Sequence, residues 1–192
     1  MKEIRIHGRG GQGAVLAAEL IVLAAFQDNK FGQAFPAFGG ERRGAAVQAF
    51  IRLDERPIRL RYRVTAPDWI LVLDPTLLDV ADVMQGMKQD GLVLINSEHA
   101  PSSLGWTQQA NVYCIPATRI ALEVLGQPLV NTAMLGAFCA VTSAVSLDAL
   151  LETFQQRFKP GAAKKNCLAA QSAFDWVKNN QITPQQVEAS LP

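Results

Sequence analysis

The sequence predicts an α/β domain with a mainly parallel sheet and an antiparallel hairpin at one edge, and three observations support this fold class. A strand-like segment at residues 3–7 runs through a glycine-rich turn into an Ala/Leu-rich segment of high helix propensity. Continuous apolar runs, typical of strands that helices cover on both faces, occur at three later positions: 69–73, 92–95 and 112–115. Helix-like segments alternate with these runs along the second half of the chain.

The first half of the chain supplies the expected hairpin. A helix is expected over 13–27, and a short strand over 33–35. Residues 46–53 and 58–64 both alternate between apolar and polar side chains, and the turn 54–57 joins them. We therefore expect these two segments to pair as the antiparallel hairpin.

The second half supplies most of the helices. The helix that follows the first buried strand is expected to begin at Thr76 or Asp79 and to reach Met87. Ser146 is the expected N-cap of a later amphipathic helix, since its hydroxyl can accept a hydrogen bond from a first-turn N–H. The helix before it is rich in small residues and should pack closely on its neighbours. The four helices expected here cover 118–125, 132–145, 147–158 and 162–179.

Length and composition limit the number of domains and the classes of function that the chain can have. The chain has 192 residues, of which 49% are apolar, and we expect one domain over 1–192 with a peripheral tail at about 181–192. The net charge of +1 argues against a strongly basic nucleic-acid binder, and no apolar run reaches the roughly 18 residues of a membrane span. The strand-like start leaves no room for a signal peptide. Three scattered cysteines without a C-x-x-C pair favour a reducing cytoplasm.

The glycine turn is the most distinctive local feature. Glycine tolerates positive φ and lets backbone N–H groups approach a ligand, and a helix N-terminus behind such a turn favours an anion. Gly8, Gly10 and Gly13 also match the G-x-G-x-x-G spacing of dinucleotide-binding turns. That fingerprint needs an acidic residue at the end of the second strand, and Pro36 to Phe38 supply none. A phosphate-type anion, the backbone of a partner and simple strand–helix packing remain open for this turn.

Polar residues follow each expected parallel strand at its carboxyl end, where ligands gather in this architecture. We expect them to line one rim together with the glycine turn. They are Asp74-Pro75, Asn96-Ser97 and the run from Pro116 to Thr118.

Arginine is concentrated in one stretch. Seven of the eleven arginines lie within 22 residues: Arg42, Arg43, Arg52, Arg56, Arg59, Arg61 and Arg63. On a strand, the last three would share one face. The stretch is either a solvated face that protects an edge strand, or a docking surface for an acidic partner or a phosphorylated cofactor. RNA is disfavoured, because the stretch lacks interleaved aromatic residues for base stacking.

The remaining reactive side chains predict no catalytic machinery. Cys114 and Cys139 lie in apolar segments, where small core residues are expected, and Cys167 lies on a helix without an activating neighbour. The cysteine spacings fit neither a cluster nor a zinc site. His7 leads into the glycine turn and could contact a ligand there, but we favour a hydrogen-bonded structural histidine. No Ser-His-Asp order or persuasive carboxylate pair is present.

Three ordered blocks resemble a known family. They are residues 5–13, residues 33–36 continuing to 41–45, and residues 131–136. Together they resemble the gamma subunit, or gamma domain, of 2-oxoacid:ferredoxin oxidoreductases of the pyruvate:ferredoxin oxidoreductase type, over about residues 3–160. Ala133 stands where that family commonly has proline.

The resemblance implies a Rossmann-like three-layer domain that packs against catalytic subunits. It implies a complex that oxidatively decarboxylates a 2-oxoacid, with pyruvate favoured, in the presence of coenzyme A, to give acyl-CoA, carbon dioxide and reduced ferredoxin. Thiamine diphosphate with magnesium, iron–sulfur clusters and coenzyme A would be held mainly by the other subunits, of alpha, beta and delta type, so the isolated chain should be inactive. No nucleic acid or membrane partner is expected.

The candidate ligand or subunit contacts lie in the two glycine-rich loops. They are Gly8, Gly10, Gly11, Gln12, Gly13, Arg42 and Arg43. No catalytic residue and no metal ligand is assigned to this chain. Two rival readings remain: a free-standing NAD(P)-binding oxidoreductase, which the missing carboxylate disfavours, and a purely structural interaction subunit.

Overall fold

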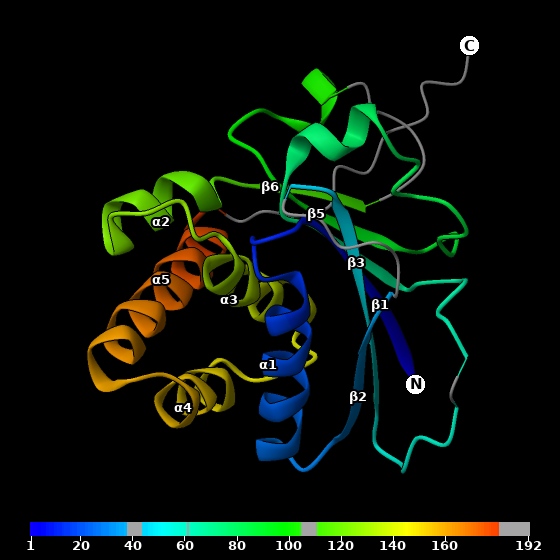
Figure 1. The fold of residues 1–192 in the computed structure, drawn as a ribbon, viewed down its shortest axis with the longest axis horizontal. Coiled ribbons are helices and arrows are strands. Elements are labelled where there is room, and N and C mark those ends of the chain that lie inside the picture. Colours follow the sequence, from blue (N-terminus) through cyan, green and yellow to red (C-terminus); the bar gives the residue numbers. More distant parts are fainter. Residues whose placement is uncertain (38–43, 61, 105–110, 181–192) are drawn as a thin grey trace.

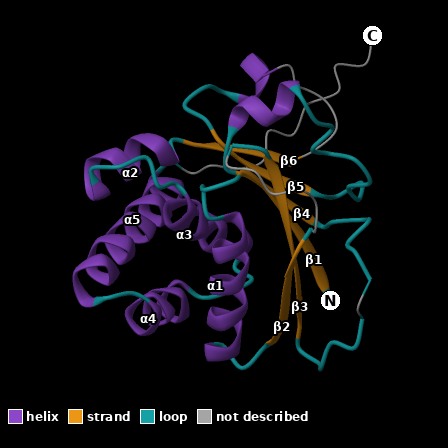
Figure 2. Cartoon of the chain, in the orientation of Figure 1, coloured by secondary structure: helices purple, strands orange, loops and turns teal. Residues whose placement is uncertain are grey.

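The computed structural model describes residues 1–37, 44–60, 62–104 and 111–180, and it contains a six-stranded sheet with helices gathered on one face (Figures 1 and 2). The strand order is β2-β3-β1-β4-β5-β6. β1, β4, β5 and β6 are parallel, whereas β3 is antiparallel to both β1 and β2. The strands are β1 (Lys2–Arg9), β2 (Phe31–Pro36), β3 (Ala46–Asp54), β4 (Trp69–Val72), β5 (Leu92–Asn96) and β6 (Asn111–Ile115). The expected α/β class, mainly parallel with an antiparallel edge, is confirmed.

Five α-helices cover one face of the sheet within the described residues (Figure 2). Their bounds are α1 (Ala14–Gln27), α2 (Ala117–Leu125), α3 (Asn131–Thr142), α4 (Leu147–Arg157) and α5 (Pro160–Asn179). The expected N-cap of α4 is confirmed, because Ser146 Oγ accepts a hydrogen bond of 3.1 Å from the Ala149 N–H. No helix in the described ranges is long and apolar enough to cross a membrane.

α3 is the central helix of this layer, and ten of its twelve residues are buried. Its small residues let α5 come close. A Cβ at Gly136 would collide with the backbone carbonyl of Ala170 on α5, so only glycine fits there. The prediction of a closely packed, small-residue helix is therefore confirmed, although the helix ends at Thr142 rather than at residue 145.

The opposite face of the sheet is covered by turns rather than by a long helix. The helix expected from residue 76 or 79 to 87 is wrong: the chain forms the 3₁₀ helix η1 (Pro75–Asp79) and then a series of turns. Asp74 is the N-cap of η1, and its Oδ1 accepts from the Thr76 N–H at 3.0 Å. Inside the expected helix, Asp82 Oδ1 accepts from the Met84 N–H at 3.2 Å, a local bond that competes with helix formation. A second short 3₁₀ helix, η2 (Pro101–Leu104), follows β5.

The expected pairing of 46–53 with 58–64 is also wrong. Both edges of β3 are already hydrogen-bonded, one to β1 and the other to β2, so no edge is left for a further strand. The antiparallel hairpin is β2–β3 instead, with Phe31 opposite Asp54 and Pro36 opposite Ala49. The described residues of 58–64 form no strand and lie over the sheet face that the helices leave open (Figure 1).

Candidate functional site: the glycine corner

The turn between β1 and α1, here called the glycine corner (residues 8–13), is closed by its own glutamine. Gln12 Oε1 accepts a hydrogen bond of 2.7 Å from the Arg9 N–H, and the Gln12 N–H donates to the Arg9 carbonyl at 3.0 Å. Gly11 and Gly13 have φ of 98° and 77°, which side-chain-bearing residues rarely adopt. The sequence therefore needs glycine at these two positions to reverse the chain between strand and helix.

A carboxylate just after β4, that of Asp74, bonds to two side chains of the corner. Asp74 Oδ2 accepts a hydrogen bond of 2.8 Å from Gln12 Nε2 and forms an ion pair of 3.3 Å with Arg9 Nε. Burial alone would raise the pKa of Asp74, but hydrogen bonds from Thr76 and Gln12 and the charge of Arg9 outweigh it and lower this pKa. Asp74 therefore stays ionised and fixes the Gln12 side chain.

The N-terminus of α1 opens at this corner. Gly13 is its N-cap and provides no side chain to accept a hydrogen bond, and the first turn carries no acidic residue. The first N–H groups of a helix have no intrahelical acceptor, and the helix dipole adds partial positive charge there. A Cβ built on Gly11 meets no atom of the described residues within 4 Å. This end of α1 is suited to an anion.

Asn131, the first residue of α3, forms the inner wall of the corner. An ideal Cβ on Gly13 would lie only 2.6 Å from Asn131 Nδ2, so the two residues pack directly on each other. Asn131 is 9% exposed, so most of its side chain is buried at this contact. Sequence reasoning named Asn131 only as part of a family block; that block was the one available signal for this contact.

The strand ends form one connected rim, as the sequence predicted. Leu73 links two of them, since its N–H donates to the His7 carbonyl at 2.8 Å and its carbonyl accepts from Asn96 Nδ2 at 3.0 Å. Asn96 Oδ1 in turn accepts from the Thr118 N–H at 3.0 Å. The Asn96 amide is thus used to join β5 to α2, which makes it a structural member of the rim.

The second predicted loop reaches the corner through its described end. Gly10 N–H donates to the Ala45 carbonyl at 2.9 Å, and Gly44 N–H donates to the Gly10 carbonyl at 3.2 Å. Of the predicted contacts, Gly8, Gly10, Gly11, Gln12 and Gly13 lie together. Arg42 and Arg43 lie outside the described residues, next in sequence to Gly44.

His7 is buried beneath the rim. It is 3% exposed, and its Nε2 accepts a hydrogen bond of 3.0 Å from Arg5 Nε. Burial, and next the positive charge of Arg5, lower the pKa of His7 to about 3. The imidazole is neutral at physiological pH and acts as an acceptor for Arg5, which agrees with the structural role expected for it.

The thiols are inactive core groups. Burial raises the pKa of Cys114 to about 11, and burial with the nearby Asp28 charge raises that of Cys139 to about 12. Burial also raises the pKa of Cys167. All three are free, and no group of three or more potential metal ligands occurs in the described residues.

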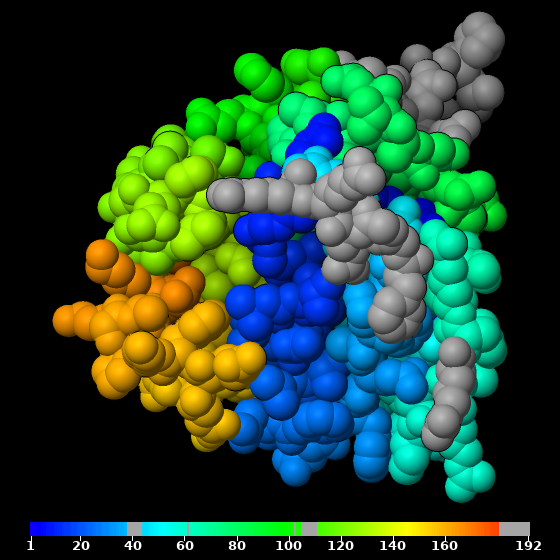
Figure 3. All heavy atoms as spheres, viewed as in Figure 1, coloured from blue at the N-terminus to red at the C-terminus, as the bar shows by residue number. Residues whose placement is uncertain are grey.

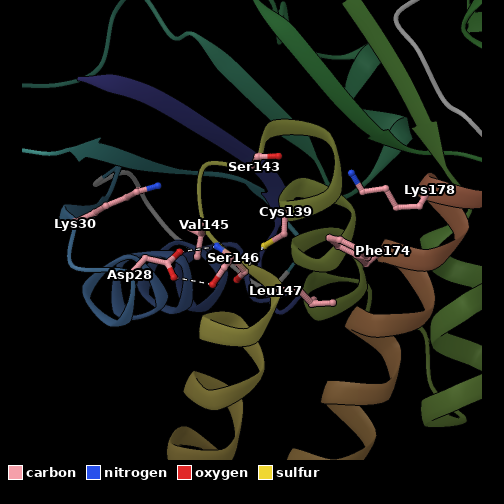
Figure 4. Close-up of a pocket in the computed structure, with 9 residues that line it drawn as sticks. All are labelled: Asp28, Lys30, Cys139, Ser143, Val145, Ser146, Leu147, Phe174 and Lys178. Atoms are coloured by element: carbon pink, nitrogen blue, oxygen red, sulfur yellow. Dashed lines mark hydrogen bonds between the residues drawn. The ribbon is translucent and has the colours of Figure 1, made fainter.

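A separate cavity of about 460 Å³ lies at the far end of α1, roughly 20 Å from the corner along the helix (Figure 4). Its polar groups bond to one another. Asp28 accepts from both the N–H and the Oγ–H of Ser146 at 2.6 Å, and Lys30 Nζ donates to the Ala144 carbonyl at 2.7 Å. These bonds tie α1 to the start of α4, which is a structural role.

A family model described as pyruvate ferredoxin/flavodoxin oxidoreductase matches residues 3–176. The chain belongs to this family. The resemblance drawn from the three sequence blocks is therefore confirmed, and the match extends beyond them.

Curated and solved members of the pyruvate ferredoxin/flavodoxin oxidoreductase family are similar over nearly their whole length. Pyruvate synthase subunit PorC of Methanothermobacter marburgensis is 51% identical over 180 residues, which cover 94% of this chain and 99% of that one. The common gamma subunit of the pyruvate/ketoisovalerate oxidoreductases of Thermococcus kodakarensis is 46% identical over 178 residues, or 91% and 96% of the two chains. The crystal structure of a pyruvate oxidoreductase subunit from Thermotoga maritima is 33% identical, with a TM-score of 0.78 over 91% of this chain and 95% of that one.

Proposed function

We propose that this chain is the gamma subunit of a multi-subunit 2-oxoacid:ferredoxin oxidoreductase, with pyruvate as the favoured substrate. The full-length similarity to pyruvate synthase subunit PorC carries this proposal. The complex would convert a 2-oxoacid and coenzyme A into acyl-CoA and carbon dioxide, and pass two electrons to ferredoxin. The Thermococcus relative is named as common to a pyruvate and a ketoisovalerate oxidoreductase. That name favours a division of labour in which other subunits select the 2-oxoacid.

The redox chemistry is assigned to partner chains. An iron–sulfur cluster needs a set of cysteine thiolates, and the three thiols here are protonated and unpaired. The three cysteines therefore do not fit an iron–sulfur cluster. Thiamine diphosphate with magnesium and the iron–sulfur clusters would be held by the alpha-, beta- and delta-type subunits, with ferredoxin as the external acceptor.

The glycine corner is proposed to contact the phosphate groups of coenzyme A. The N-terminus of α1, which has no side-chain cap, and the absence of any described atom near a Cβ built on Gly11 both favour an anionic ligand. The candidate set remains Gly8, Gly10, Gly11, Gln12 and Gly13, with Arg42 and Arg43 as further phosphate contacts. The alternative occupant of the corner is the backbone of a neighbouring subunit.

A free-standing NAD(P) oxidoreductase is disfavoured by the sheet order. In a dinucleotide fold, the strand that follows the first helix lies beside β1 and presents an acidic residue at its end. Here β3 is inserted between β1 and β2, so β2 lies two strand spacings, about 10 Å, from β1. It ends in Pro36 rather than in a carboxylate.

The test uses the co-expressed complex and the isolated chain side by side. The complex should reduce viologen when supplied with pyruvate and coenzyme A, and the isolated chain should not; activity of the isolated chain alone contradicts the subunit assignment. A Gly11→Ala complex, whose gamma chain should be destabilised only by backbone strain at φ 98°, should still assemble but need a higher coenzyme A concentration for half-maximal rate. Less assembled complex, with an unchanged coenzyme A requirement in the complex that does form, would favour a structural role for the corner.

A further inference from the structure

Between β3 and β4, the described residues 55–60 and 62–67 form no strand but are bonded to the sheet. We name these residues the arginine strap. It runs along the side of the sheet away from α1, α3, α4 and α5 (Figure 1). In Figure 3 its turquoise atoms form one edge of the molecular surface. Arg52 anchors it from below: its Nη2 donates to the Tyr62 carbonyl at 2.6 Å. Arg63 adds a second bond, from Nη2 to Gln48 Oε1 at 2.9 Å.

The strap carries an excess of positive charge. Its twelve residues include three arginines and one carboxylate, Glu55, which gives it +2 in a chain of net charge +1. Arg56, Arg59 and Arg63 are exposed, and none forms an ion pair with a residue of the described chain.

The carboxylates nearest in sequence and in the sheet are already paired with other cations. Glu3 bonds to the buried Arg52 at 2.8 Å, and Asp54 pairs with the N-terminal ammonium at 3.1 Å. Asp68 pairs with both Lys2 and Lys88. The positive charge of the strap also acts on the protein interior. Burial is the main cause that lowers the pKa of Arg5, and the charge of Arg63 is the second. The strap therefore presents a surface that an acidic surface would complement.

An aromatic side chain is fixed among these arginines. Tyr62 is 59% exposed, yet its ring lies 4.8 Å from the Arg52 guanidinium carbon, which also lies 5.3 Å from the ring of Phe35. Stacking on a buried cation holds the tyrosine ring in one orientation before any partner arrives. Tyrosine and arginine are the side chains most often found at energetic centres of protein interfaces.

We propose that the arginine strap is a docking surface for an acidic protein surface on another subunit of the complex. This inference rests on the proposed function. Arg59 and Arg63 would pair with carboxylates of that subunit, and Tyr62 would be covered between them. A nucleic acid is the less favoured occupant, because Tyr62 is the one aromatic residue that the strap itself carries.

The test is co-purification of the complex with charge-reversed strap variants. Arg59→Glu with Arg63→Glu should weaken assembly at least about tenfold, and should remove the dependence of assembly on salt that the wild type shows. The matched control is Lys164→Glu with Lys165→Glu, which reverses the same number of charges on the exposed face of α5 and should assemble like the wild type. Arg59→Lys with Arg63→Lys should retain most of the affinity. Thermal melting of each isolated chain confirms that the variants fold.

The outcomes separate the two proposals. If the wild-type chain fails to co-purify with any oxidoreductase subunit, the proposed function is wrong, and the strap proposal falls with it. If the wild type assembles and the strap variants assemble equally well at every salt concentration, the strap proposal alone is wrong. Binding of a single-stranded oligonucleotide that the charge reversal abolishes, with assembly unchanged, would likewise overturn it.

Discussion

Asn131 at the first turn of α3 packs directly against Gly13 at the first turn of α1, with 2.6 Å between its Nδ2 and the place where a Cβ of residue 13 would stand. Two helix starts that are far apart in the sequence are thus fitted to each other at the glycine corner. This contact determines which residue can occupy position 13.

Gly13→Ala should destabilise the chain by about 2–4 kcal/mol, because alanine would be strained at a φ of 77° and would also displace Asn131. The control is Gly11→Ala, where φ is 98° but no atom lies within 4 Å of the added Cβ. It should cost about 1–2 kcal/mol, from backbone strain alone. Urea unfolding of both variants measures the difference, and equal midpoints would contradict the packing argument.

Asp74→Asn should loosen the glycine corner and reduce the loss of folding stability that occurs as pH falls. Asp74 has a lowered pKa in the folded chain, so its contribution to stability is present above its unfolded value of 3.8 and is lost as pH falls through the folded value. Unfolding measured from pH 7 down to pH 2 should show a smaller acid-induced loss in the variant than in the wild type. Parallel curves would show that Asp74 is not coupled to the fold.

The His7 ring should remain neutral well below the usual range for histidine. Its pKa of about 3 lies below the ordinary 6.5, so the unfolded chain binds a proton that the folded chain rejects between these values, and stability falls as pH is lowered through that window. Imidazole ¹⁵N NMR of a His99→Ala variant, in which His7 is the one histidine left, should show no titration between pH 8 and pH 5. A midpoint near 6.5 would mean that His7 is not buried beside Arg5 in solution.

Gly136→Ala should destabilise the chain by about 1–3 kcal/mol, because the added Cβ would meet the Ala170 carbonyl and push α3 away from α5. Gly161→Ala, in the first turn of α5, is the matched control, since nothing lies within 4 Å of its Cβ. It should be neutral or stabilise by up to about 1 kcal/mol, through helix propensity. Thermal denaturation compares the two variants.

The sequence predicted the elements whose local signal and packing agree. The apolar runs became β4, β5 and β6, and the Ser146 cap and the small-residue helix α3 lie where they were expected. The glycine corner was found because strand, glycines and helix are contiguous in the chain. Its partner Asn131 could not be derived from local pattern, because the contact depends on how α3 packs beside α1.

The wrong predictions lie where contacts with other parts of the chain decide the local structure. Residues 58–64 alternate like a strand because Val64 is buried and Ile58 and Leu60 are half-buried, whereas Arg59 and Arg63 are exposed. That pattern reports one-sided packing, and it cannot reveal that β3 already has a neighbour on each side. Arg52 looked like one more exposed arginine, but it is fully buried and bonded to Glu3. The helix expected up to residue 87 is wrong: η1 ends at Asp79, and Asp82 then accepts from the Met84 N–H in a turn.

The central place of β1 in the sheet has a consequence during synthesis. β1 is made first, but its neighbours are β3, with Lys2 opposite Leu53, and β4, with Ile4 opposite Trp69. One edge of β1 can form its strand hydrogen bonds only after residues 46–54 have left the ribosome, and the other edge only after residues 69–72 have done so. Until both neighbours have emerged, the nascent chain exposes a strand with an unpaired edge, and unpaired strand edges are prone to aggregate or to engage a chaperone.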